Sequence, residues 1–411
     1  MTLLTECALA ALALLGHFSL CVSLHNWLHA MPIPPKLMKA STILVFLFLV
    51  LAPPALAAWW LFAWGWPAGL RAASFHYLPF GYLCVTWAIA AVATPVWVFQ
   101  RWGEGGGKPS LTNRTTRHPL SSPDGSPLAR GFATTLLQRI PGNQTMELWA
   151  QTKELPIFDL PPTFDGLTIT HLTDLHMMDH LALPYFQQVI DITNALKSDL
   201  VAVTGDIVER PQCLSWLAPT LGRLTAPLGV FFIFGNHDYR MKAWAQARRL
   251  LVEECGLVDA LGRVVDVFPS PTRRGAGGEG GTAMQADLSN PVLKLAGNEL
   301  PWAGPAPQFE DPRQPSEFRL LLSHTPDNIR WAQANDVQLM LAGHTHGGQI
   351  RFPVIGPVVC PSYYGVKYAA GLFYEPPTLL HVCRGISGEQ AIRLNCAPEV
   401  TKLILRRPPR T

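Results

Sequence analysis

Five short motifs rich in Asp, His and Asn follow one another in the middle of the chain. They are Thr173-Asp174-Leu175-His176, Gly205-Asp206, Gly235-Asn236-His237-Asp238, Ser323-His324 and Gly343-His344-Thr345-His346. Carboxylate, imidazole and amide groups are ligands for hard to borderline divalent metals, and the motifs offer no thiolate. Together they supply enough ligands for two adjacent metal ions, which is the apparatus of metal-assisted phosphoester hydrolysis.

Each motif follows an apolar run that predicts a buried strand. The runs are residues 167–170, 200–203, 230–234, 320–322 and 337–341. Helix-like stretches lie between them, at residues 185–197, 213–224, 243–255 and 329–335. This order is typical of open α/β sheets, in which ligands collect beyond the carboxyl ends of the strands. We therefore expect the five motifs to meet at one edge of an α/β domain.

The motif set resembles that of the calcineurin-like metallophosphoesterases over residues 155–405. The ending Gly343-His344-Thr345-His346-Gly347-Gly348-Gln349-Ile350, with apolar segments ahead of the domain, is more similar to the bacterial membrane-anchored YkuE/YaeI-like branch. The resemblance implies a four-layer α/β/β/α sandwich with phosphohydrolase activity. That branch includes an enzyme that hydrolyses UDP-2,3-diacylglucosamine.

The resemblance also implies a ligand set for two divalent metal ions, with manganese expected and iron or zinc as the alternatives. One ion would take Asp174, His176 and His346, the other Asn236, His324 and His344, with Asp206 between them. Neutral His and Asn cancel no charge, so two dications and two aspartates leave roughly two positive charges, which suits a phosphate. The pKa of a bridging water would fall from about 15.7 toward neutrality, giving a hydroxide for in-line attack on phosphorus.

His237 has no metal left to bind in this assignment. It could donate a hydrogen bond to the phosphoryl oxygen or a proton to the leaving oxygen, so His237 and Asp206 are the expected catalytic residues. The best-known protein phosphatases of the family use an Asp to orient this His, and Glu209 stands at that place here. Their Gly-Asn-His-Glu motif ends in Asp238 in this chain. These departures argue against a protein phosphatase.

Three apolar stretches precede the motifs, at residues 8–28, 41–64 and 77–99. None contains Asp, Glu, Lys or Arg, and each approaches or exceeds the ~20 residues that span a bilayer, although His17 and His25 interrupt the first. The flanking basic residues are Lys36 and Lys39 in the first loop, Arg71 in the second, and Arg101, Lys108, Arg114 and Arg117 after the third stretch. This bias predicts a cytoplasmic catalytic domain, and a bacterial inner membrane is expected.

The composition predicts how the chain is organised. We expect a transmembrane region of about three helices at residues 1–100, a linker and lead-in at 101–154, the catalytic domain at 155–405 and a basic tail at 406–411. Gly, Ser, Pro and Thr are frequent at 105–127, which predicts a linker, and glycine-rich residues 270–281 predict a surface insertion. The net charge of +3 is small and spread out, so no nucleic-acid partner is indicated, and no obligate protein partner is evident.

The anchor indicates a class of substrate. Holding an enzyme at a bilayer raises its effective concentration only toward membrane-resident molecules, so a lipid-linked or nucleotide-linked phosphodiester or pyrophosphate is favoured. One alternative is a non-catalytic binding module with the same fold, and another is a phosphomonoesterase or protein phosphatase. Every expected ligand and His237 are present, which favours an enzyme. No Asp, Glu, Lys or Arg lies within the spans, which argues against a transport role.

Overall fold

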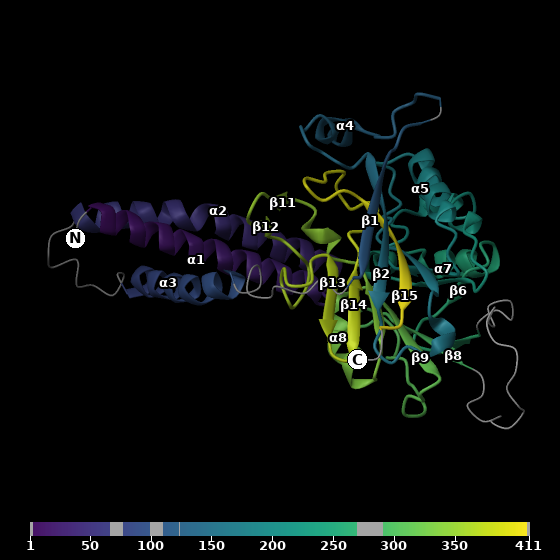
Figure 1. Ribbon diagram of the computed structural model, residues 1–411. Coiled ribbons are helices and arrows are strands. Elements are labelled where there is room, and N and C mark those ends of the chain that lie inside the picture. Colours follow the sequence, from purple (N-terminus) through teal and green to yellow (C-terminus); the bar gives the residue numbers. More distant parts are fainter. Residues whose placement is uncertain (1–2, 66–76, 99–109, 123, 269–290, 409–411) are drawn as a thin grey trace, which may run out of the picture. The chain divides into compact units, whose positions relative to one another are not determined.

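The computed structural model describes the chain except for residues 1–2, 66–76, 99–109, 123, 269–290 and 409–411. The chain divides into two compact units, whose elements are labelled in Figure 1. Unit 1 contains residues 1–106 and 361–367, and unit 2 contains residues 107–360 and 368–411. The predicted insertion at 270–281 lies outside the described residues.

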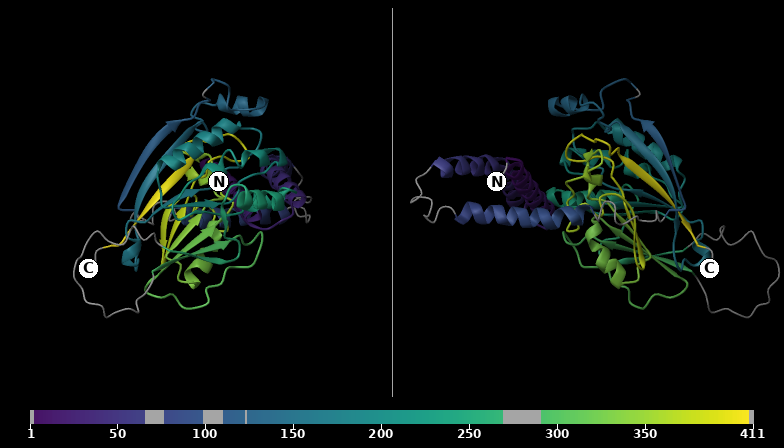
Figure 2. Two further views of the ribbon diagram at one scale, coloured as in Figure 1. Left: turned by 90° about the vertical axis from the view of Figure 1, so that its right-hand side faces the viewer. Right: turned by 60° about the vertical axis from the view of Figure 1, so that its left-hand side comes forward.

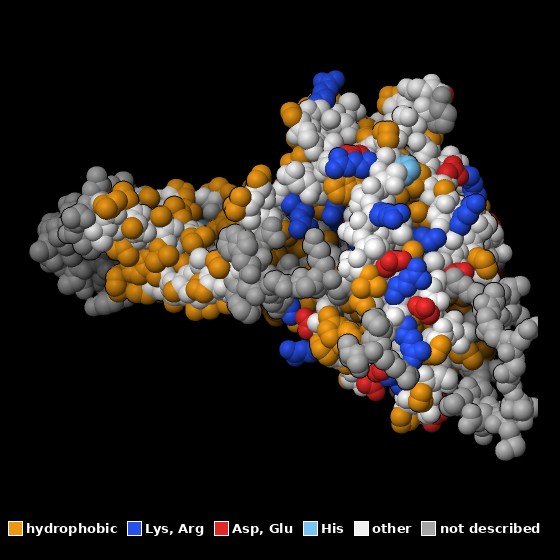
Figure 3. Space-filling model, viewed as in Figure 1, with side chains coloured by type: hydrophobic (Ala, Val, Ile, Leu, Met, Phe, Trp, Pro, Cys, Tyr) orange, Lys and Arg blue, Asp and Glu red, His pale blue; other side chains and the backbone are white. Residues whose placement is uncertain are grey.

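Unit 1 is built from three long helices, α1 (Leu3–Ala30), α2 (Pro35–Gly65) and α3 (Tyr77–Val98). Each contains a stretch apolar and long enough to cross a membrane, namely Leu4–Ala30, Pro35–Trp59 and Pro79–Val98. Helices α1 and α3 pack closely, because a Cβ added at Gly16 would lie 1.8 Å from the Thr86 carbonyl oxygen. Hydrophobic side chains cover much of the visible face of these helices (Figure 3). The three predicted apolar segments are therefore helices of the expected kind.

Unit 2 contains a seven-stranded sheet that carries the first three motifs. Its strand order is β1 (Thr112–Pro119), β2 (Glu147–Pro156), β15 (Glu399–Arg406), β3 (Thr168–Leu172), β4 (Leu200–Thr204), β5 (Val230–Ile233) and β6 (Val258–Asp259). Strands β3 to β6 are parallel, and β15 pairs with β3 in the antiparallel direction. The loops after β3, β4 and β5 therefore leave the sheet at the same edge.

A second, six-stranded sheet carries the other two motifs. Its order is β13 (Gly371–Glu375), β14 (Thr378–Val382), β10 (Leu339–Ala342), β9 (Glu317–Ser323), β8 (Val292–Asn298) and β7 (Val264–Val267). The four inner strands are parallel to one another. A separate short hairpin, β11 (Arg351–Phe352) and β12 (Gly356–Pro357), follows the last motif.

The strands and helices of unit 2 lie in layers, seen from two further sides in Figure 2. The alternation of side chains along the strands explains these layers. Along β4, Leu200 and Ala202 join a core between the two sheets, whereas Val201 and Val203 face the helices α5 (Leu183–Ala195) and α7 (Trp244–Glu253). Helix α8 (Ile329–Ala334) packs against β14 on the second sheet. Each fully buried Val or Leu stabilises the sandwich by about 1.5–3 kcal/mol. The expected α/β/β/α fold is confirmed.

Two local predictions were wrong. Residues 112–119, expected as part of a linker, form strand β1 at the edge of the first sheet, paired from Thr112 with Glu154 to Pro119 with Glu147. This strand has mostly polar, exposed side chains, so it shows no apolar alternation. Residues 213–224, expected as one helix, lie instead in two short 3-10 helices, Pro211–Trp216 and Leu221–Arg223. Pro219 between them explains the break, because proline lacks the N–H and its ring clashes with the preceding turn.

Candidate metal centre

All seven predicted ligands lie just beyond the carboxyl ends of five strands. Asp174 and His176 follow β3, Asp206 follows β4, Asn236 follows β5, His324 follows β9, and His344 and His346 follow β10. The two sheets thus contribute ligands from both sides of the sandwich. All seven side chains belong to residues that are buried or nearly so.

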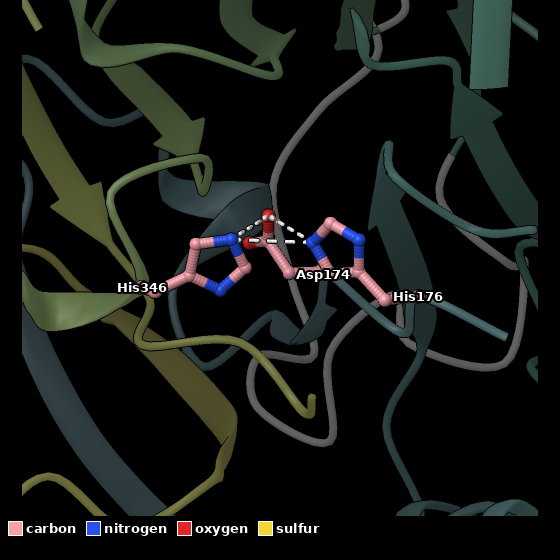
Figure 4. Close-up of side chains that lie close together, drawn as sticks. All are labelled: Asp174, His176 and His346. Carbon is pink, nitrogen blue, oxygen red and sulfur yellow. Dashed lines mark hydrogen bonds and ion pairs between the residues drawn. The ribbon is translucent and has the colours of Figure 1, made fainter. Parts of the chain in front are cut away.

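Asp174, His176 and His346 form a first cluster (Figure 4). The Nε2 atoms of His176 and His346 are 3.2 Å apart. They lie 3.8 Å and 3.7 Å, respectively, from Oδ1 of Asp174. Three ligand atoms therefore converge on one point, as binding of a single cation requires.

Asp206, His324 and His344 form a second cluster. Nε2 of His324 lies 3.1 Å from Oδ2 of Asp206 and 3.2 Å from Nδ1 of His344. The same Oδ2 atom is 3.5 Å from Nε2 of His176 in the first cluster. Asp206 is therefore the carboxylate that faces both clusters.

The backbone at these residues is held in an unusual conformation. Left-handed φ values occur at Asp174 (52°), His176 (45°), Asp206 (51°), His344 (68°) and His346 (50°). Such conformations cost on the order of 1–3 kcal/mol each and persist only where the surroundings enforce them. The backbone N–H of His344 donates to Oδ2 of Asp174 at 3.1 Å, which ties the first and last motifs together.

Close packing explains two of the motif glycines. A Cβ at Gly343 would lie 2.4 Å from Oδ2 of Asp174, and one at Gly235 would lie 2.3 Å from Oδ1 of Asp206. Neither residue has room for a side chain beside these carboxylates. The glycines therefore allow the strand-end loops to approach one another closely.

Backbone carbonyls orient two of the histidines. Nδ1 of His324 donates to the Thr204 carbonyl at 2.7 Å, and Nδ1 of His346 lies 3.2 Å from the Ser387 carbonyl. These contacts leave both Nε2 atoms free to bind a metal. Arg393 is buried and donates to the carbonyls of His346 and Arg384 at 3.1 Å and 2.7 Å. Its guanidinium also lies 3.5 Å from Nδ1 of His346. Arg393 lies outside the five motifs, which therefore contain no signal for it.

Buried polar atoms without a hydrogen-bond partner indicate whether cations fit these clusters. Among the described residues, buried Oδ2 of Asp206, Oδ1 of Asn236 and Nε2 of His344 have no hydrogen-bond partner. A buried polar atom without a partner costs about 1–3 kcal/mol, so such atoms are expected to have a ligand. Asp206 and Asn236 thus hold oxygen atoms without a partner at the clusters, whereas the atom of His344 that faces the second cluster is Nδ1. The residues present fit divalent cations.

Asp206 and His346 are held in the unprotonated forms that bind cations. Burial alone would raise the pKa of Asp206, but His324 and His237 outweigh it and hold that pKa well below its usual value. Burial lowers the pKa of His346 to about 3, despite the opposing effect of Asp174. Burial would likewise lower the pKa of His324, but Asp206 and Asp174 raise it to about 9. A cation binding Nε2 of His324 must therefore displace a proton at neutral pH.

His237 lies beside the first cluster, at the start of helix α6 (Asn236–Arg240). Its Nδ1 atom is 3.1 Å from Oε2 of Glu209, and Oε1 of Glu209 contacts Nδ1 of His176. Nε2 of His237 is 2.9 Å from the Arg240 guanidinium and 3.4 Å from the Glu389 carboxylate. Glu209 therefore joins a predicted metal ligand to the predicted catalytic histidine.

Asp238 fixes the loop that presents Asn236 and His237. Its carboxylate accepts hydrogen bonds from the backbone N–H groups of Gly235 and Ile207, both at 2.9 Å, and of Val208 at 3.0 Å. It thus ties the loop after β5 to the loop after β4. Burial and the nearby Asp206 raise the pKa of Asp238 to about 7. Asp238 acts on the loop backbone and not on the metal clusters.

An α/β/β/α sandwich with such clusters at its strand ends defines a metallophosphoesterase. Residues 167–348 match the family model described as calcineurin-like phosphoesterase, and the chain belongs to this family. It is therefore a metal-dependent phosphoric ester hydrolase.

Characterised and uncharacterised relatives share most of their length with it. The chain is 31% identical to the uncharacterized metallophosphoesterase YkuE of Bacillus subtilis, over 60% of this chain and 82% of YkuE. It is 30% identical to phosphodiesterase YaeI of Escherichia coli, over 58% of this chain and 81% of YaeI. It is 25% identical to the UDP-2,3-diacylglucosamine pyrophosphatase LpxG of Chlamydia trachomatis, over 59% of this chain and 85% of LpxG.

Proposed function

We propose that the protein is a membrane-anchored phosphohydrolase with two metal ions that cleaves a phosphodiester or pyrophosphate bond. The observation that supports this most directly is the pair of His and carboxylate clusters. Asp206 belongs to the second cluster, and its Oδ2 atom also lies 3.5 Å from Nε2 of His176 in the first. In this proposal Asp174, His176 and His346 hold one ion, Asn236, His324 and His344 hold the other, and Asp206 binds both. Two divalent ions so held would supply positive charge for the phosphate and would activate a water for attack on phosphorus. Manganese is the preferred metal, with iron or zinc as alternatives.

His237 is proposed to donate a hydrogen bond to the phosphoryl oxygen or a proton to the leaving oxygen. It lies beside the first cluster without belonging to either ligand set, and its ring is 4.9 Å from that of His176, edge to face. The Glu209 carboxylate at Nδ1 holds the ring so that Nε2 points away from it. The Arg240 guanidinium and the Glu389 carboxylate border Nε2.

The substrate is proposed to be lipid-linked or nucleotide-linked. Three apolar helices would anchor the chain in a bilayer, and an anchored enzyme gains effective concentration only toward membrane-resident substrates. LpxG, a relative, is named for activity on a lipid-bearing nucleotide sugar, which is consistent with this class. The basic residues that flank the spans favour a cytoplasmic position for the catalytic domain. The membrane is proposed to be a bacterial inner membrane.

Turnover by the metal-reconstituted protein tests this proposal. The substrates are bis-p-nitrophenyl phosphate as a diester, p-nitrophenyl phosphate as a monoester, and UDP-2,3-diacylglucosamine, each with manganese, iron or zinc. We expect the diester and the pyrophosphate to be cleaved faster than the monoester. Cleavage of the monoester alone would favour a phosphomonoesterase. Metal binding without turnover on any substrate would favour the non-catalytic binding module.

A further inference from the structure

The β11–β12 hairpin of unit 2 carries an exposed apolar tip. Phe352, Val354 and Ile355 have exposed fractions of 51%, 76% and 46%, and Val359 just after the hairpin is 43% exposed. These residues are consecutive or nearly so along 352–359, and Pro353 between them is exposed as well. Single exposed apolar residues are common on protein surfaces, but a contiguous apolar group marks an interaction site.

The tip is also conformationally unusual. Val354 has a φ of 65°, in the left-handed region that β-branched residues rarely adopt. The N–H of Ile355 donates to the Pro353 carbonyl at 2.7 Å, which closes a three-residue turn around Val354. Turns of this kind with positive φ are rare and strained. A strained valine that is mostly exposed gains little from packing within the protein, so the conformation indicates a role at the surface.

The hairpin is attached to the loop that carries the last metal motif. It begins five residues after His346. The N–H of Arg351 donates to the Leu394 carbonyl at 2.9 Å, and its guanidinium lies 3.4 Å from the Gly347 carbonyl. A Cβ at Gly348 would lie 2.4 Å from Cβ of Pro357, so the base of the hairpin packs tightly on the motif. A partner bound at the tip would therefore be held close to the metal centre.

Helices α1, α2 and α3 indicate the kind of partner that the tip could meet. Those helices contain the candidate membrane spans. An enzyme tethered to a bilayer by these spans stays within reach of lipid, so a lipid surface is the partner that the apolar tip fits.

We propose that the tip formed by Phe352, Val354 and Ile355 inserts into the surface of a phospholipid bilayer and presents the metal centre to phosphate groups there. The proposal rests on the membrane anchoring and substrate class proposed above. Aromatic and branched aliphatic side chains bind the interface by burying apolar area at the boundary between headgroups and acyl chains. The spans would hold the chain in the membrane, and the tip would set how the catalytic unit faces it.

Photo-crosslinking of the full-length protein in phospholipid vesicles tests the contact directly. The crosslinking amino acid p-benzoylphenylalanine is placed at position 354 and, in a matched control, at position 252. Val252 lies on α7 and is 43% exposed, yet it lies outside the hairpin. We expect adducts with lipid at position 354 and none above background at position 252. Equal lipid adducts at both positions, or adducts at 354 only with a second copy of the chain or another protein, would overturn the proposal.

A paired activity measurement tests the consequence. Val354→Asp combined with Ile355→Asp is compared with Val252→Asp, all in the full-length chain. We expect the double variant to hydrolyse a vesicle-borne lipid phosphodiester on the order of tenfold more slowly, because charged residues oppose insertion. Its metal content and its rate on soluble bis-p-nitrophenyl phosphate should match those of the wild type, and Val252→Asp should change neither rate. An unchanged rate on vesicle-borne lipid would argue against the proposal. If the wild type cleaves no lipid substrate, the proposed substrate class fails while the crosslinking result still decides whether the tip enters the bilayer.

Discussion

At the scale of single residues, the two carboxylate oxygens of Asp206 have different contacts: Oδ1 binds the backbone, and Oδ2 faces the two clusters. Oδ1 accepts the backbone N–H of His237 at 2.8 Å, which fixes the loop that carries the predicted catalytic histidine. Oδ2 is buried without a hydrogen-bond partner and lies between His324 and His176. One side chain thus organises the catalytic loop and faces both proposed metal sites.

We predict that Asp206→Asn abolishes activity while the fold is retained. The amide oxygen can still accept the His237 N–H, but a neutral ligand binds two cations far more weakly than a carboxylate. Metal analysis should therefore show that both ions are lost or weakly held, with an unchanged circular dichroism spectrum. Two ions per chain together with near wild-type turnover would show that Asp206 is not the shared ligand.

His237→Ala should behave differently. Because His237 belongs to neither ligand set, its loss should leave metal content near normal and lower kcat by about 10² to 10⁴-fold, the usual range for a proton-transfer group. Metal analysis and steady-state kinetics on a soluble diester provide the check. Loss of one metal ion in this variant would mean that His237 is a ligand.

Glu209→Gln should affect both neighbours at once. Glu209 contacts Nδ1 of His176 and lies 3.1 Å from Nδ1 of His237, so its charge supports a ligand and the catalytic group. Removing a partner of a ligating histidine typically lowers metal affinity about 10 to 100-fold. We therefore expect weaker metal binding together with a lower kcat at saturating metal, whereas His237→Ala shows only the second effect. Normal metal affinity in Glu209→Gln would place Glu209 outside the metal centre.

At the scale of elements, a buried polar network joins the two sheets below the metal clusters. His171 on β3 contacts His381 on β14 at 3.0 Å and the Thr204 hydroxyl at 2.8 Å. Lys153 on β2 lies 3.3 Å from His381 and 3.4 Å from Glu399 on β15. The backbone carbonyl of Thr204 also accepts a hydrogen bond from Nδ1 of the predicted ligand His324. The network is therefore connected to the metal centre through Thr204.

This network should make stability depend on pH. Burial, with a smaller contribution from Lys153, lowers the pKa of His171 to about 3, and burial lowers the pKa of His381 well below its usual value. Between the unfolded pKa of about 6.5 and the folded value, the unfolded chain binds more protons, so the free energy of unfolding decreases as pH falls. For His171 the loss reaches about 3 kcal/mol near pH ~4.5.

The variant His171→Gln isolates this effect. It lacks the titrating ring, so its unfolding temperature should start lower but decline less steeply between pH 6.5 and 4.5 than that of the wild type. His118→Gln, on the edge strand β1, serves as the matched control and should keep the wild-type slope. Identical slopes for His171→Gln and the wild type would show that His171 does not control the acid sensitivity.

The elements that carry the motifs were predictable because their apolar runs are buried on both faces. Every residue of β4, β9 and β10 is buried, and the runs at residues 200–203, 320–322 and 339–342 are continuous apolar segments that end at or just before a motif. Strand β1 was missed because it lies at a sheet edge and its polar side chains face solvent. Arg393 was missed because it lies outside the motifs and contacts mainly backbone carbonyls, which leave no sequence pattern.

At the scale of the whole molecule, the structure shows where the catalytic unit begins. Strand β2 lies between β1 and β15, and the N–H of Leu111 donates to the Glu154 carbonyl at 2.8 Å ahead of β1. A cut at residue 155, where the sequence pattern placed the start of the domain, would remove two strands from the sheet. The free edge of β15 would then be exposed, which favours aggregation. A truncated protein must therefore begin near residue 107, where unit 2 begins.

Such a truncated protein distinguishes the effect of the helices on catalysis from their effect on access to membrane-resident substrate. The metal clusters and His237 belong entirely to unit 2, so its metal content and its rate on soluble bis-p-nitrophenyl phosphate should equal those of the full-length protein. On a lipid phosphodiester in vesicles we expect a loss on the order of 10²-fold, because encounter returns from two dimensions to three. The comparison requires equal concentrations of metal-loaded protein, with the full-length chain reconstituted in the same vesicles. Equal rates on vesicle-borne lipid would remove the anchor as an argument for a lipid substrate. A reduced rate on the soluble diester as well would instead show that the helices support the catalytic unit itself.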